Sequence, residues 1–540
     1  MLHLLALRHS PLVLLLAGSS LETPSKASPP PTVRLEVGVL EGTRLGSREE
    51  TTAFPGVPYA APPVGGLRWK PPQPAASWVG TRKATSFGAS CPQLPEGWLP
   101  ELPWSEDCLY LNVWTPRLSP TAALPVIVWF HGGGNKAGRS EQTELGPALS
   151  RLGVVVVSFN YRLGPFGFLA HPALTAESEH HTSGNYGLLD QLQALEWTRR
   201  NISQFGGDPN RLTVVGHSAG AFDICLLMAS PLATGMFQQA ILESGECQSA
   251  LVRDSRTPLG YDALLDSGEA EGHRLADDLH VPDGPDALEK LRRLPADAIL
   301  RAWSKDPKVH LDVVVDGWII PEQPARVFGD GRQARIPVIV GSTADEATVF
   351  GHQGPTTVRQ YRKYLTANSG KYSFQQFQAY PAAVDGAVAG QYLRLQNDLF
   401  AFGAYSLARA MTQAGQKAYV YLFSFVDTGK YARFGAFHGE ELMFLSDSFP
   451  NDWKRGPDEA MLGEVMRAYW TQFAKTGDPN APALLNWPAY DATLEQVIEL
   501  GRTVNVGPLT HAAQLRVLGR IMREILAETA KRSALAAPTH

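Results

Sequence analysis

Ser218 lies between two glycines, at the boundary between two predicted elements. The apolar and β-branched residues 212–215 predict a short buried strand, and residues 222–228 predict a helix. The Gly-x-Ser-x-Gly pattern of residues 216–220 therefore falls on a tight turn, where strained backbone angles expose the serine hydroxyl as a nucleophile. The alternative is a glycine-rich surface turn with an incidental serine. The flanking strand and helix make that interpretation the weaker one.

A serine nucleophile also needs hydrogen-bond donors for the oxyanion that forms during acyl transfer. Residues 131–134, His-Gly-Gly-Gly, follow an apolar run that ends at Phe130. Their backbone N–H groups, which no side chains shield, can converge on a small anion together with the N–H of Ala219. An ordinary flexible glycine loop is the alternative. The position directly after a buried strand favours the oxyanion site.

A catalytic base for Ser218 must be one of fourteen histidines. Hydrolases with this type of turn place the nucleophile first in the chain, then an acidic residue, then histidine. His438 has the most suitable setting, in residues 435–441 after a predicted strand, although an ordinary surface histidine is the alternative. The order leaves seven candidates: His273, His280, His310, His352, His438, His511 and His540.

The elements that position these residues are predicted by hydrophobic pattern. Residues 124–130 and 154–159 are continuous apolar runs, which are typical of strands covered on both faces in a mostly parallel sheet. Residues 186–205 carry leucines at helical spacing before a glycine pair. Further strands are expected at residues 109–114, 239–243, 336–341 and 418–425, an edge hairpin at 33–41, and late helices at 469–475 and 515–525.

This alternation of strands and helices favours one α/β domain. We expect it to span residues 33–530, with a charged, mainly helical insertion at residues 249–328 packed over the sheet. Residues 1–20 resemble a secretory signal peptide, with a short apolar stretch between a basic start and small residues. Residues 21–32 resemble a solvated linker, and residues 531–540 a frayed tail.

Composition limits the partners and the compartment. The net charge of −5 and the absence of a basic stripe in the sequence give no reason to expect a nucleic-acid partner. No apolar run after the first residues is long enough for a stable membrane anchor. The spacing of Cys91 and Cys108 allows a disulfide, which would fit a secreted or periplasmic protein. We expect Cys225 and Cys247 to be buried free thiols.

Several motifs together resemble the type-B carboxylesterases, the family that includes the cholinesterases. The resemblance extends in order from Val33 to Tyr490, and therefore over nearly the whole chain. It implies an α/β-hydrolase fold, with a mostly parallel twisted sheet flanked by helices and a helical insertion over the active site. The matching segments are residues 105–114, 131–134, 184–191, 205–209, 216–220 and 476–479.

The resemblance also implies roles for individual residues. It implies a reaction that needs no metal ion or cofactor. In the Asp-Glu pair of the family, the second residue is the acid, so Glu346 rather than Asp345 is expected to orient the base. The implied set is Ser218 as nucleophile, His438 as base, Glu346 as acid, Gly133, Gly134 and Ala219 as oxyanion donors, and a Cys91–Cys108 disulfide.

This chain departs from the family pattern at two positions beside the nucleophile. His217 replaces the usual glutamate before the serine, and Ala221 replaces a glycine. The loss of a carboxylate so close to the site would change substrate and pH preferences. We hypothesise that His217 pairs with Glu441, whose family counterpart lies near the missing glutamate.

The sequence therefore predicts a hydrolase that acts on small-molecule carboxylic esters through an acyl-enzyme, as a monomer or homodimer. One alternative is a binding or adhesion protein on the same fold, although an intact set of Ser218, His438 and Glu346 argues against it. The others are a lipase and a specialised hydrolase of amides, carbamates or a complex natural ester.

Overall fold

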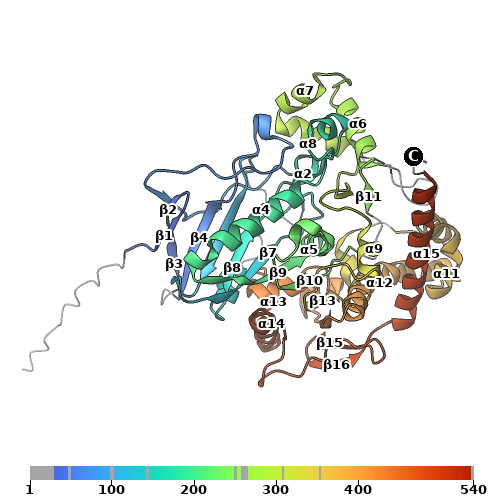
Figure 1. The fold of residues 1–540 in the computed structure, drawn as a ribbon. Coiled ribbons are helices and arrows are strands. Elements are labelled where there is room, and N and C mark those ends of the chain that lie inside the picture. The colour runs from blue at the N-terminus through green and yellow to red at the C-terminus, as the bar shows by residue number, and fades with distance from the viewer. Residues whose placement is uncertain are drawn as a thin grey trace, which may run out of the picture.

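The computed structural model describes most of the chain, and its side chains as far as residue 528 (Figure 1). The expected signal peptide and most of the expected linker lie outside the described residues. The described ranges are 29–46, 50–97, 103–141, 145–247, 252–256, 266–306, 309–351 and 354–536.

A sheet of eleven strands forms the centre of the described part, in the order β16-β15-β14-β13-β10-β9-β7-β8-β6-β4-β3. Neighbours from β15 to β8 run parallel, whereas β16 at one edge and β6, β4 and β3 at the other are antiparallel. The predicted α/β-hydrolase fold with a mostly parallel sheet is confirmed. The strands are β3 (Thr43–Leu45), β4 (Thr51–Pro58), β6 (Tyr110–Thr115), β7 (Leu124–Phe130), β8 (Val155–Phe159), β9 (Gly207–His217), β10 (Gln239–Glu243), β13 (Val338–Thr343), β14 (Ala418–Phe423), β15 (Gln496–Leu500) and β16 (Val504–Pro508).

The continuous apolar runs form strands because helices cover both faces of the sheet. In β7, Val126 and Val128 belong to one hydrophobic cluster, and Ile127 and Trp129 belong to the cluster on the opposite face. In Figure 1 the helices α4 (Tyr186–Asn201) and α5 (Ala219–Ala229) lie above the sheet, and α13 (Glu440–Ser446) and α14 (Pro457–Thr476) lie below it. Three short helices precede α4 in the chain: α1 (Leu145–Ser150), α2 (Gly164–Phe168) and α3 (Pro172–Glu177).

The predicted hairpin near the start of the chain is present as β1 (Thr32–Leu35) and β2 (Gly38–Glu41). It joins β5 (Thr81–Lys83) in a separate three-stranded sheet rather than the edge of the main one.

Two helical stretches interrupt the succession of strands. The first follows β10 and contains α6 (Gly268–Asp278), α7 (Ala287–Arg293), α8 (Ala296–Lys305), α9 (Pro324–Gly329) and the short strands β11 (Arg253–Asp254) and β12 (Val314–Val315). The second, which the sequence analysis did not single out, follows β13 and contains α10 (Val358–Ser369), α11 (Ser373–Ala379) and α12 (Asp385–Gln413).

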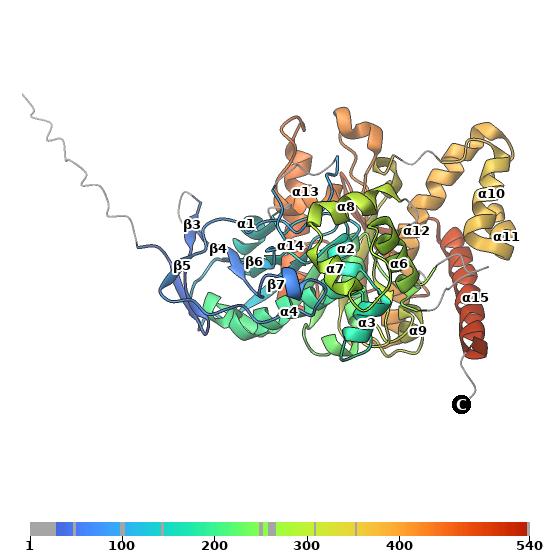
Figure 2. The same cartoon turned by 90° about the horizontal axis from the view of Figure 1, so that it is seen from above.

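The last helix, α15 (Ala512–Ala536), continues beyond residue 531, where a tail was expected. It packs with α11 at one end of the molecule (Figure 2). None of the helices in the described ranges is long and apolar enough to cross a membrane.

Two disulfides are present, and the second corrects a sequence prediction. Cys91 and Cys108 are bonded, and so are Cys225 and Cys247, whose Cα atoms lie 5.5 Å apart. The expectation of free thiols at Cys225 and Cys247 was therefore wrong. Because β9 and β10 are parallel neighbours, the segment after β10 lies against the helix that follows β9. This proximity in space is not visible in the sequence.

We predict that the protein contains no free thiol in its oxidised form. In denatured, unreduced protein no cysteine should react with a thiol-alkylating reagent. After reduction all four cysteines should react. Replacing both Cys225 and Cys247 by alanine should lower the free energy of unfolding by about 3 kcal/mol, measured by urea denaturation, because the bridge closes a loop in the unfolded chain. Two thiols alkylated before reduction would contradict the second bridge.

Candidate active site

The turn after β9 holds Ser218 in a conformation that is rare for residues with a side chain. Its backbone angles are φ 55° and ψ −121°, and α5 begins at the next residue. The Ser218 N–H donates to the carbonyl of Glu243 on the neighbouring strand at 2.8 Å. A Cβ atom at Gly216 would lie 2.6 Å from the Gly220 carbonyl carbon, and one at Gly220 would lie 2.2 Å from the Phe130 oxygen. Both positions therefore require glycine.

The glycine loop after β7 faces this turn. A Cβ atom at Gly132 would lie 3.1 Å from the Ser218 Cβ atom. The backbone N–H groups of Gly133 and Gly134 have no protein acceptor among the described residues. Ala219 is the first residue of α5, where backbone N–H groups have no partner within the helix. The structure thus places all three expected donors at the edge of the sheet where β7 and β9 end.

Buried polar groups that the sequence analysis missed hold the glycine loop. The side-chain amide of Asn135 donates to Asp223 at 3.1 Å and to Asp312 at 3.2 Å. The Tyr161 hydroxyl donates to the carbonyl of His131 at 2.8 Å. Burial raises the pKa of Asp223 to about 8 against the opposing hydrogen bonds, and the charge of Asp312 adds to the rise. An aspartate within an otherwise apolar helix was the available signal for this network.

Glu346 and His438 are in direct contact. The His438 Nδ1 atom and the Glu346 Oε2 atom form a short hydrogen bond, and Glu346 has no exposed surface. The other carboxylate oxygen accepts from the Thr343 backbone N–H at 2.8 Å, at the end of β13. The Asn397 side chain of α12 accepts from the N–H of Ala347 at 2.9 Å and holds the same turn. The carboxylate therefore has a fixed orientation toward the ring.

Aromatic rings surround the imidazole of His438. The ring centres of His217, Phe350 and Phe400 lie 4.5, 5.0 and 5.3 Å from its own. Burial lowers the pKa of His438, but the charge of Glu346 and the hydrogen bond to it outweigh this effect. The net result is a pKa above the ordinary value.

Ser218 opens into a cavity of about 250 Å³. Phe400 lines this cavity and also packs on the His438 ring, so this one side chain connects the cavity at Ser218 with the imidazole. The hydrogen bonds of the described residues include none between Ser218 and His438. The lining is mostly apolar: Ser218, Phe222, Ser244, Gly245, Glu246, Leu399 and Phe400.

His217 and Glu441 lie near each other without a hydrogen bond. Their closest atoms, Nε2 and Oε1, are 3.9 Å apart, and the Ser244 hydroxyl donates to Glu441 at 3.1 Å. Burial and the neighbouring His438 lower the pKa of His217 well below its ordinary value. Burial and the charge of Glu346 raise the pKa of Glu441 to about 8, although His438 opposes the rise. Burial therefore favours the uncharged form of each group, and their pairing stays a prediction.

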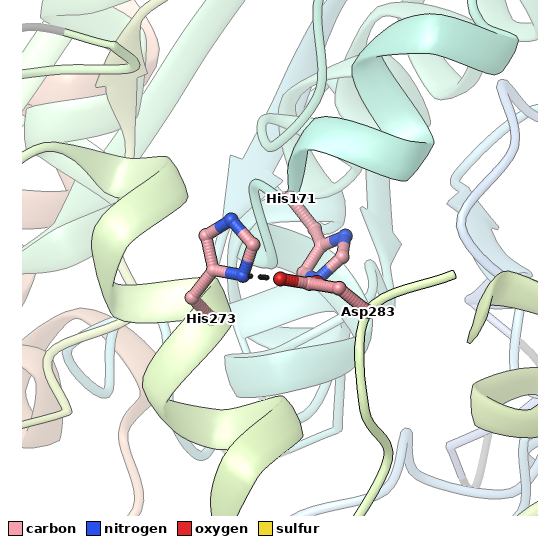
Figure 3. A group of neighbouring side chains, drawn as sticks. All are labelled: His171, His273 and Asp283. Carbon is pink, nitrogen blue, oxygen red and sulfur yellow. Dashed lines mark ion pairs between the residues drawn. The ribbon is translucent and has the colours of Figure 1, made fainter. Parts of the chain in front are cut away.

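A second cluster of titratable groups lies outside this cavity (Figure 3). His171, His273 and Asp283 place nitrogen and oxygen atoms within 4.8 Å of one another, and His273 Nδ1 lies 3.4 Å from Asp283. His171 Nδ1 accepts from the N–H of Ala173 at 3.1 Å. The neutral ring therefore carries its proton on Nε2, the buried atom without a partner, and a protonated nitrogen cannot ligate a metal ion. We assign no metal ion to this group.

We predict that Glu441 makes stability depend on pH. In the unfolded chain a glutamate loses its proton near about pH 4.3, whereas in the folded protein Glu441 keeps it to about pH 8. Between these values the folded state binds the extra proton, so the free energy of unfolding falls as pH rises. Glu441→Gln should remove up to about 1.4 kcal/mol per pH unit from this slope, measured by urea denaturation. Glu524→Gln, at an exposed position of α15, is the control. Equal slopes in the two variants would contradict the prediction.

Comparisons with known proteins show which family the chain belongs to. Residues 29–518 match the model of the carboxylesterase family. The chain is 36% identical over 509 residues to fumonisin B1 esterase of Sphingopyxis macrogoltabida, covering 91% of each chain. It is 34% identical over 494 residues to para-nitrobenzyl esterase of Bacillus subtilis (strain 168), covering 88% of this chain and 95% of the other.

A solved structure of a PNB esterase superposes with a TM-score of 0.78 at 30% identity, over 90% of this chain and 99% of the other. The sequence relatives and the solved structure thus agree on both fold and chemistry. The protein belongs to the carboxylesterase family of serine hydrolases, and the relatives and the solved structure named here are esterases.

Proposed function

We propose that this protein hydrolyses small carboxylic esters through Ser218, His438 and Glu346. The observation that carries the proposal is the buried contact between His438 and Glu346, beside a serine on a strained turn. All three lie on segments that follow parallel strands of the sheet, where α/β folds place their binding sites.

The reaction runs in two acyl-transfer steps. The Ser218 oxygen attacks the ester carbonyl while His438 Nε2 takes the hydroxyl proton, and Glu346 stabilises the imidazolium that results. The oxyanion accepts hydrogen bonds from the N–H groups of Gly133, Gly134 and Ala219. The alcohol leaves with the proton from His438. Water, activated by the same imidazole, then releases the acid and restores the serine.

The missing hydrogen bond between Ser218 and His438 does not oppose this assignment. In enzymes without substrate, catalytic hydrogen bonds are often long and shorten only when the substrate binds. The serine side chain has one rotatable bond before its oxygen, so a change of rotamer is enough to redirect the hydroxyl.

The size and the lining of the cavity support a substrate that carries a small apolar group. Phe222, Leu399 and Phe400 provide apolar walls, and a volume of about 250 Å³ is just below the usual range of ligand sites, about 300–1,000 Å³. Two relatives are named as esterases, one for fumonisin B1 and one for para-nitrobenzyl esters, and these names support an ester as the substrate of this protein. A panel of esters, amides, carbamates and emulsified lipids distinguishes the proposed esterase from an amidase or a lipase.

The two disulfides support an oxidising compartment. We therefore propose that the protein is secreted or periplasmic, with residues 1–20 removed on export. Mass spectrometry of the exported protein, which determines its first residue, tests this assignment.

We predict that Ser218 is the only residue labelled by an alkyl phosphonate and that labelling abolishes esterase activity. Ser218→Ala should lower kcat for para-nitrophenyl acetate by about 10⁴-fold or more, because no other group forms the acyl-enzyme. Ser244→Ala, which removes a second hydroxyl from the same cavity, is the control and should remain open to phosphonate labelling. Full activity of Ser218→Ala would refute the mechanism.

We predict that Glu346 sets the acid limit of activity. His438 must be uncharged to take the proton, and its raised pKa makes kcat/KM fall with acidification from above about pH 6.5. Glu346→Gln removes the main charge that raises this pKa, so the acid limb should move to lower pH. The value of kcat should also fall by about 10⁴-fold.

The neighbouring carboxylate provides a matched control for this experiment. Asp345 accepts from the Ala436 N–H at 3.0 Å and does not contact the imidazole in the described structure. Asp345→Asn should keep the pH profile of the unchanged protein. If the pH profile shifted in Asp345→Asn and not in Glu346→Gln, the acid would be Asp345 and the proposed assignment to Glu346 would be wrong.

A further inference from the structure

A second cavity, of about 570 Å³, lies between α9, α12 and α15. Its apolar lining comes from all three helices and includes Phe328, Phe402, Met522 and Leu526. None of its lining residues belongs to the cavity at Ser218. The volume is within the range of sites for small organic ligands, which is about 300–1,000 Å³.

Four arginines line this cavity. Arg516, Arg520 and Arg523 follow helical spacing and therefore share one face of α15, and Arg409 lies on α12. Arg516 pairs with Glu495 at 2.8 Å. The guanidinium of Arg409 lies 5.5 Å from the centre of the Tyr405 ring.

Arg409, Arg520 and Arg523 have no carboxylate within ion-pair distance among the side chains that the structure describes. No acidic residue lines the cavity. This local excess of positive charge stands out on a chain whose net charge is −5. Arginine stays charged at every physiological pH. Arg516, Arg520 and Arg523 are exposed to solvent, so an anion can reach them.

The shape and charge together define the class of ligand. A planar guanidinium group binds a carboxylate through two parallel hydrogen bonds, and the apolar lining removes hydrocarbon from water. We propose that this cavity binds an amphipathic carboxylate, a molecule with one carboxylate group and an apolar chain. The carboxylate contacts the guanidinium groups of Arg520 and Arg523, and the chain lies along Phe402 and Met522.

Calorimetry with the full chain tests the proposal, with sodium dodecanoate below its micelle concentration as the probe. Dodecanoate should bind with an affinity that falls as salt is added. Arg520→Gln combined with Arg523→Gln should weaken it by about tenfold or more, because charged hydrogen bonds are lost. Arg199→Gln combined with Arg359→Gln removes the same charge from exposed positions and should leave the affinity unchanged.

Two further measurements locate the ligand and exclude misfolding. A diazirine analogue of dodecanoate should label peptides from α12 and α15 after irradiation, and dodecanol and acetate should compete poorly. Thermal unfolding followed by circular dichroism should give the same midpoint for both double variants. Equal affinity in the two double variants, or labelling confined to the peptides around Ser218, would overturn the proposal. Because no readout is esterase activity, the result is independent of the proposed catalytic residues.

Discussion

The contact between α5 and the ends of β7 and β9 is the constraint on which the rest of the site depends. Backbone atoms at Gly216, Gly220 and Phe130 approach so closely that no side chain fits between them. This contact fixes the unusual backbone of Ser218 and brings the glycine loop after β7 to the same place. The parallel sheet extends the arrangement sideways, because β10, β13 and β14 end at the same edge.

Burial determines which of the acidic groups around the site carry charge. Glu346 has a backbone N–H and an imidazole as partners. Glu441 and Asp223 receive only hydrogen bonds from uncharged groups, and burial favours their protonated forms. One acidic side chain thus faces the base, whereas its neighbours act as uncharged hydrogen-bonding groups. Where the family usually has a further carboxylate, His217 is a neutral ring packed against His438.

The sequence predicted those parts of the molecule that local pattern determines. Apolar runs located the strands, and the glycine patterns located Ser218 and the loop at Gly133. It did not reveal pairs that depend on strand order, such as Cys225 with Cys247 or Asn135 with Asp223. The helix α12 was also missed, because Gly386, Gly390 and Gly403 weaken its helical pattern and its apolar residues contact several partners. Three of the arginines share one face of α15, and Arg409 joins them only when α12 and α15 pack together.

The glycine at position 403 has a consequence for how this esterase can diversify. A methyl group there would lie 2.4 Å from the Cγ atom of Glu246, a residue in the wall of the cavity at Ser218. The position of the Glu246 side chain in the cavity wall therefore depends on residue 403 having no side chain. Residue 403 lies on α12, which contributes no group to the reaction. Replacement by alanine would displace the flexible glutamate side chain and reshape the chamber without adding or removing a reacting group. Substrate range and chemical mechanism can therefore evolve separately in this scaffold.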